Sequence, residues 1–161
     1  MGAPFLLVTG FGAFENVADN PSGRLAEVMD LRADAVGLRL PVTYGEVESL
    51  LDAALTGAAR GTVGILALGV HRGGEFRLEE RSGASDVSER PAAAGAPSPA
   101  GPRLALWSGF DLEACARACA QAGPHPVRLS QDAGGYVCDF LYGLALAKAR
   151  ALGVNALFLH V

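Results

Sequence analysis

The sequence lacks several features that would assign it to a broad class at once. It contains no uninterrupted apolar run of about 18 residues, so we predict no membrane span. Its 13 Lys and Arg are outnumbered by 17 Asp and Glu and form no basic stripe, which argues against a nucleic-acid partner. The first residues, MGAPFLLV, carry no basic segment, so we predict no secretory signal. Three cysteines without framework spacing argue against a disulfide scaffold and for a reducing, cytoplasmic location.

What the sequence does contain is a regular alternation of apolar segments. Runs typical of buried strands occupy 4–10, 35–42, 62–69, 125–130 and 155–161, and amphipathic helical patterns occupy 19–31, 45–61, 110–123 and 136–153. This alternation predicts an α/β fold: a three-layer α/β/α sandwich around a twisted, mainly parallel sheet, with residues 1–161 as one domain. Residues 85–103 are rich in Pro, Ala, Gly and Ser, which predicts a long mobile loop.

Two candidate catalytic residues follow from the position of ligand sites in such folds. Ligands bind at the carboxyl ends of parallel strands, where Cys138 begins a helix and His160 ends the last strand. A helix N-terminus stabilises a thiolate by about 0.3–1 kcal/mol, so Cys138 is a candidate nucleophile. The alternative for Cys138 is a buried structural cysteine, and the alternative for His160 is a polar strand end.

Other histidines and cysteines compete for such roles. His71 lies in a glycine-rich loop at the same edge of the sheet, whereas His125 is expected at the opposite end. Cys115 and Cys119 share one face of a helix, where they are either metal ligands or, more simply, small apolar residues.

The acids Glu75, Glu79 and Glu80 are candidates for orienting an imidazole. Strand alternation in FRLEERS places Leu78 and Glu80 on one face of the strand, and Glu79 on the other. If Leu78 points inward, Glu80 does too, and a buried carboxylate needs a partner such as a histidine. The alternative is a solvated run of charges.

Five segments, in order, resemble the pyroglutamyl peptidase I family of cysteine peptidases. They are LLVTGFGAFENVADNPSG, LPVTYGE, GVHRGGEFRLEERS, SQDAGGYVCDFLYGLAL and ALFLHV, which together cover nearly the whole chain. The resemblance implies a thiol peptidase with Cys138 as nucleophile, His160 as general base and acid, and Glu80 as the residue that orients His160.

The resemblance also implies a substrate pocket and a reaction. The pocket residues that it indicates are Phe11, Phe14, Asn20, Tyr136, Val137 and, near the oxyanion, Arg90. The expected substrates are peptides with an N-terminal pyroglutamate, whose first amide bond is hydrolysed through an acyl-enzyme without metal or cofactor. The family forms tetramers, so a homo-oligomer is expected.

Three departures from the family pattern leave other functions open. Val70 replaces a usual glutamine, and Gly12 and Ala13 replace an acidic residue and a proline in the phenylalanine loop. The sequence also stops one residue after His160, where the family continues into a C-terminal helix. The alternatives are therefore a weak or inactive relative that binds pyroglutamyl ligands, and a generic α/β ligand-binding module.

Overall fold

The computed structural model describes residues 3–58, 61–83, 106–134 and 136–161. Its elements, in chain order, are β1 (Phe5–Phe11), α1 (Pro21–Asp30), β2 (Ala35–Leu40), α2 (Tyr44–Ala58), β3 (Thr62–Gly69), β4 (Phe76–Glu79), α3 (Leu112–Ala122), β5 (Val127–Ser130), α4 (Val137–Leu152) and β6 (Asn155–His160). Arg90 and the loop predicted over 85–103 lie outside the described residues.

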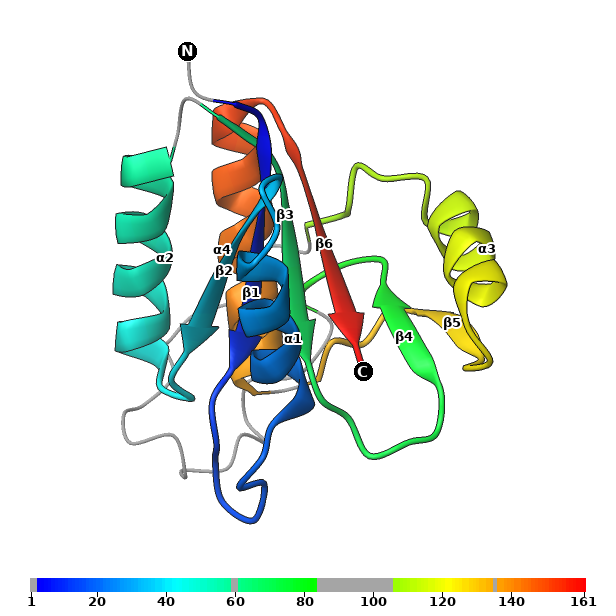
Figure 1. Ribbon diagram of the computed structural model, residues 1–161. Helices are drawn as coiled ribbons and strands as arrows, with labels where there is room; N and C mark the ends of the chain where they lie inside the picture. Colours follow the sequence, from blue (N-terminus) through cyan, green and yellow to red (C-terminus); the bar gives the residue numbers. More distant parts are fainter. Residues whose placement is uncertain (1–2, 59–60, 84–105, 135) are drawn as a thin grey trace.

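The strands form one six-stranded sheet in the order β2-β1-β3-β6-β4-β5. All neighbouring strands are parallel except β4 and β6, which run antiparallel. Helix α1 covers one face of the sheet, and α2 and α4 cover the other (Figure 1). The predicted three-layer α/β/α architecture with a mainly parallel sheet is therefore confirmed.

The larger apolar core lies between the sheet and helices α2 and α4. Leu7, Ile65 and Phe158 point from the strands into this layer and meet the buried faces of the two helices. A smaller cluster fills the opposite face, where Val8 and Leu68 pack against α1. Because both faces are covered, the central strands are apolar throughout, as is usual for parallel sheets.

The first strand and the first helix approach each other unusually closely. Asn20 caps α1 by accepting a hydrogen bond from the Ser22 backbone N–H at 3.1 Å, and Pro21 follows at the first helical position. A Cβ atom on Gly10 would lie 2.0 Å from the Ser22 carbonyl oxygen. Glycine at position 10 therefore lets the end of β1 lie directly against the start of α1.

Helix α4 begins near the carboxyl ends of the parallel strands and packs along the sheet against β3 and β6 (Figure 1). Its C-cap is Gly153, whose φ of 70° is the left-handed conformation that favours glycine. No helix within the described ranges is both long and apolar enough for a membrane crossing.

Candidate active site

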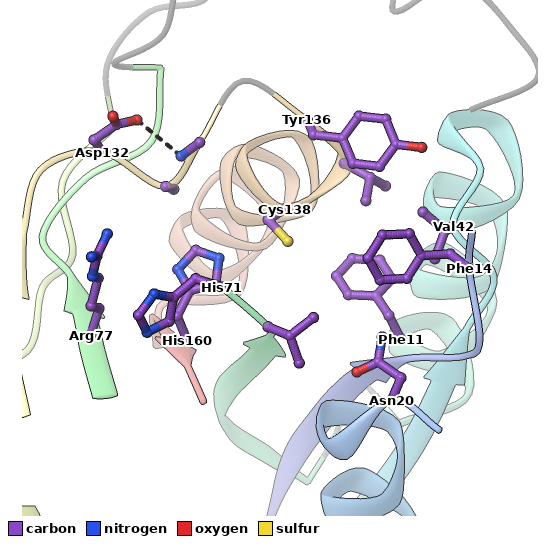
Figure 2. Close-up of a pocket in the computed structure, with 14 residues that line it drawn as sticks. Phe11, Phe14, Asn20, Val42, His71, Arg77, Asp132, Tyr136, Cys138 and His160 are labelled. Carbon is purple, nitrogen blue, oxygen red and sulfur yellow. Dashed lines mark hydrogen bonds between the residues drawn. The ribbon is translucent and has the colours of Figure 1, made fainter. Parts of the chain in front are cut away.

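A cleft of about 260 Å³ opens at the carboxyl ends of β1, β3 and β6. One part of its wall is apolar and includes Phe11, Phe14 and Val42, whereas the opposite part carries His71, Arg77 and Asp132. Figure 2 shows the sulfur of Cys138 between the two parts, with imidazole rings on one side and phenylalanine rings on the other. The cleft is thus divided into an apolar half and a polar half at the sulfur of Cys138.

Cys138 occupies the second position of α4, at the end of the helix that faces the cleft. The N-cap residue of α4 is Tyr136, whose side chain makes no capping hydrogen bond. The first backbone N–H groups of a helix have no partner within the helix, so this end of α4 favours a developing negative charge. A Cβ atom on Gly69 would lie only 2.9 Å from the Cys138 sulfur, so the absence of a side chain at the end of β3 leaves room for the thiol.

Burial raises the pKa of the Cys138 thiol from 9.0 to about 12, and the charges of Glu79 and Asp139 contribute to the rise. A shift of this size corresponds to roughly 4 kcal/mol against ionisation. The helix N-terminus favours the thiolate by only about 0.3–1 kcal/mol. Burial therefore opposes ionisation of the Cys138 thiol more strongly than the helix N-terminus favours it.

The imidazole of His160 is held by a buried carboxylate. Its Nδ1 lies 2.8 Å from Oε1 of Glu79, whose side chain is fully buried, while His160 itself is 5 % exposed. An ionised carboxylate can only accept a hydrogen bond, so Nδ1–H donates to Glu79. The lone pair of the neutral ring is then on Nε2, which is the arrangement that a general base requires.

The carboxylate that contacts His160 belongs to Glu79, and the assignment to Glu80 is wrong in this geometry. In the antiparallel pairing of β4 with β6, Arg77 lies opposite His160 and Glu79 lies opposite Phe158. Glu79 and His160 therefore share the face of the sheet that is covered by α4. Leu78 is buried on the other face of the sheet. A Glu80 side chain on the same face as Leu78 therefore points away from the His160 imidazole.

Two residues of α4 that the sequence did not single out hold the end of β4. The Tyr142 hydroxyl donates to the Glu79 backbone carbonyl at 2.6 Å, and Oδ1 of the buried Asp139 accepts from the Gly83 N–H at 2.7 Å. The helix that carries Cys138 thus fixes the backbone at the acid that contacts His160 and at Gly83, four residues after it. No pattern in the sequence indicates these contacts, because they join residues 56 and 63 positions apart.

The apolar half of the cleft is built by the loop after β1. Phe14 is held by paired backbone bonds with Val17, at 3.1 and 2.8 Å, and faces the cleft beside Phe11 (Figure 2). Asn20 donates from Nδ2 to the Gly12 carbonyl at 3.0 Å, which ties this loop to the start of α1. Tyr136 and Val137 complete the lining, together with Val70 at the end of β3.

The rival residues divide between the cleft and the surface. His71 lies in the cleft, 5.8 Å from His160 between ring centroids, with Nε2 2.5 Å from the Glu75 carbonyl oxygen. His125 lies outside the cleft, with its ring 4.9 Å from Phe76. Cys115 and Cys119 lie on α3, also outside the cleft. Within the described part of the chain, no three His, Cys, Asp or Glu side chains are grouped to hold a metal ion.

Solved structures of known peptidases share this fold. The pyrrolidone carboxyl peptidase from Thermococcus litoralis matches with a TM-score of 0.86 at 21 % identity, over 98 % of this chain and 76 % of that one. The corresponding enzyme from Fervidobacterium islandicum matches with a TM-score of 0.84 at 24 % identity, over 98 % and 80 %. At these identities, the likeness establishes the fold.

Sequence comparison identifies the family of the chain. Pyrrolidone-carboxylate peptidase 1 from Ralstonia nicotianae is 32 % identical over 98 % of this chain and 78 % of its own length. The pyrrolidone-carboxylate peptidase from Vibrio vulnificus is 30 % identical over 97 % and 77 %. The family model described as pyroglutamyl peptidase matches residues 5–161. With the family's pattern matched from the first strand to the last, the chain belongs to the pyroglutamyl peptidases.

Proposed function

We propose that this chain hydrolyses the amide bond after an N-terminal pyroglutamyl residue of a peptide, through a thioester on Cys138. The observation that carries the proposal is the buried Glu79–His160 hydrogen bond at the edge of a cleft that also holds the Cys138 sulfur. A thiol, an imidazole and a carboxylate in one cleft are the groups of a nucleophilic triad. Family membership supports the same reaction.

The apolar half of the cleft suits the ring of a pyroglutamyl group. This N-terminus is a closed lactam without a charged amine. It therefore loses little hydration free energy when it packs against the apolar wall of Phe11, Phe14 and Val42. An ordinary N-terminal ammonium would need a carboxylate partner in the same place. The apolar residues of the wall therefore favour the lactam over a free amino terminus.

The first half of the reaction forms the acyl-enzyme. His160 takes the thiol proton at Nε2 as the sulfur of Cys138 bonds to the scissile carbonyl carbon. The Cys138 backbone N–H at the start of α4 stabilises the oxyanion, and one such donor is worth about 3–4 kcal/mol. The carbon–nitrogen bond then breaks, and His160 returns its proton to the leaving amine.

The second half frees the enzyme. Water attacks the thioester while His160 removes one of its protons. The carbon–sulfur bond then breaks as His160 passes this proton to the sulfur, which releases pyroglutamate and the Cys138 thiol. Throughout, Glu79 keeps Nδ1–H of His160 directed away from the sulfur and stabilises the imidazolium that forms in each half. His160 thus mediates every proton transfer in the cycle, and Glu79 holds its imidazole in the required orientation.

A second candidate is a relative that binds pyroglutamyl ligands and turns them over slowly or not at all. Val70 favours it, because a valine in the cleft offers no hydrogen bond to the lactam where the family usually has a glutamine. Both candidates bind a pyroglutamyl ligand, but only the first hydrolyses it at an appreciable rate. A measured rate of hydrolysis therefore separates them.

The test uses a pyroglutamyl-coumarin amide and follows release of the fluorescent amine. We expect the wild type to hydrolyse it, and Cys138→Ser and His160→Ala to lose the activity. Cys119→Ser is the matched control and should keep it, because Cys119 lies on α3 outside the cleft. Binding without hydrolysis by the wild type would favour the second candidate, and near-normal turnover by Cys138→Ser would refute the thioester.

We also propose a cellular location and an oligomeric state for the chain. The cysteines within the described residues, Cys115, Cys119 and Cys138, are all free thiols, which agrees with the proposed reducing, cytoplasmic location. The homotetramer implied by the family stays a prediction, which light scattering of the purified chain would test.

A further inference from the structure

The polar half of the cleft lies where the leaving peptide must pass. Arg77, His71 and Asp132 line the cleft on the side of Cys138 that is opposite Phe11 and Phe14 (Figure 2). If the pyroglutamyl ring occupies the apolar half, the scissile carbonyl reaches the sulfur and the rest of the peptide extends into the polar half. This step rests on the proposed function.

The sheet register brings Arg77 close to the group that protonates the leaving amine. Arg77 lies directly opposite His160 in the antiparallel β4–β6 pair. Side chains of directly opposed residues project from the same face, with Cβ atoms about 4.5–5.5 Å apart. The amine that accepts a proton from His160 is therefore carried by a residue next to Arg77.

Arg77 retains capacity to bind an anion. A terminal nitrogen of its guanidinium donates one 3.2 Å hydrogen bond to Oε1 of Glu75, and its side chain is 38 % exposed. A guanidinium has five N–H donors and binds a carboxylate through two of them. Glu75 competes for this cation, and Asp132 adds a second negative charge to the same half of the cleft.

We propose that Arg77 is a specificity-determining residue that binds a carboxylate on the peptide residue after the pyroglutamyl group. Two sources supply that carboxylate: an acidic side chain on this residue, or its own terminal carboxylate in a pyroglutamyl dipeptide. Both place the anion a few bonds from the leaving nitrogen, on the side of the cleft where His160 and Arg77 lie together. An amide or a lysine at the same place gains nothing from the guanidinium.

The experiment compares kcat/KM for two matched pairs of substrates by chromatography of the products. pGlu-Glu-NH₂ against pGlu-Gln-NH₂ tests the side-chain carboxylate, and pGlu-Ala against pGlu-Ala-NH₂ tests the terminal one. We expect the carboxylate member of at least one pair to be preferred by about fivefold, the upper range for a partly exposed ion pair. The preference should shrink as salt is raised, because added ions screen exposed charges.

Three variants assign the preference to Arg77. Arg77→Gln should bring the ratio to about one, Arg77→Lys should keep part of it, and Glu75→Gln should raise it by removing the competing carboxylate. Arg72→Gln is the matched control, since this exposed arginine of the loop before β4 does not line the cleft and should leave the ratio unchanged. Thermal unfolding checks that each variant is folded, and the Glu75→Gln result stands even if Arg77→Gln does not fold.

The outcomes separate this inference from the proposed function. If the wild type hydrolyses all four substrates without discrimination, or if Arg77→Gln keeps the full ratio, the carboxylate subsite is refuted and the peptidase stands. If the wild type hydrolyses none of them, both proposals are overturned.

Discussion

Replacing Glu79 or Glu80 by glutamine distinguishes two adjacent acids with almost identical sequence contexts. The structure places only Glu79 against His160, with Oε1 2.8 Å from Nδ1 in a fully buried position. Glu80 follows the strand end and lies, by alternation, toward the opposite face of the sheet. The two substitutions remove the same charge, so a difference between them reports geometry.

The expected loss follows from the energy of the Glu79–His160 bond. A hydrogen bond to a charged group contributes about 1.5–3 kcal/mol, which corresponds to about a 10- to 150-fold change in rate. A glutamine can also turn its NH₂ toward Nδ1, which places the imidazole proton on Nε2 and removes the base. We therefore expect Glu79→Gln to lower kcat/KM by about 10- to 150-fold, mostly in kcat, and Glu80→Gln to change it by less than about threefold.

The assay is release of the fluorescent amine from a pyroglutamyl-coumarin amide, with kcat and KM measured separately. Thermal unfolding of both variants establishes that the loss is not one of folding, because Glu79 is buried and Glu80 is partly exposed. The reasoning is refuted if Glu80→Gln suffers the large loss and Glu79→Gln does not. Equal, small effects would remove the carboxylate from the mechanism altogether.

Three further predictions concern the thiol and the packing of β1. Burial raises the pKa of Cys138 to about 12, so the rate of its labelling by iodoacetamide should still be rising between about pH 9 and 10. Mass spectrometry measures this rate, and a plateau below about pH 8 would contradict the prediction. Asp139→Asn keeps an acceptor but removes a charge that raises this pKa, so its labelling curve should move to lower pH. Gly10→Ala should lower the free energy of unfolding in urea by about 1–3 kcal/mol or more, because its Cβ would meet the Ser22 carbonyl. Gly45→Ala, on the open surface of α2, should instead leave it unchanged or raise it by up to about 1 kcal/mol, and similar losses in both would refute the close-packing argument.

The strand and helix pattern made most of the fold predictable. Continuous apolar runs such as 62–69 are typical of strands covered on both faces, and Asn20 with Pro21 marks a helix start through local chemistry alone. The same local reasoning placed Cys138 at a helix N-terminus and His160 at a strand end, because both positions depend on neighbours within a few residues.

The choice between adjacent acids was beyond that reasoning. Alternation states that Glu79 and Glu80 lie on opposite faces, but it does not state which face holds His160. The antiparallel pairing of β4 with β6 decides this, and nothing in the segment 76–82 encodes the direction of a strand at the far end of the chain. The assumption that a buried Leu78 marks the site's face failed because both faces of the sheet are buried.

The sequence by itself determined the alternation of elements and the ends of the helices, and it marked the candidates for nucleophile and base, because these depend on local propensity and on periodicity. Only the tertiary structure decided that Glu79 contacts His160, that Tyr142 and Asp139 hold the end of β4, and that Arg77 lies beside the imidazole. It also decided the direction in which the Cys138 pKa shifts, because the pKa of a thiol depends on the burial and charges that distant segments bring around it.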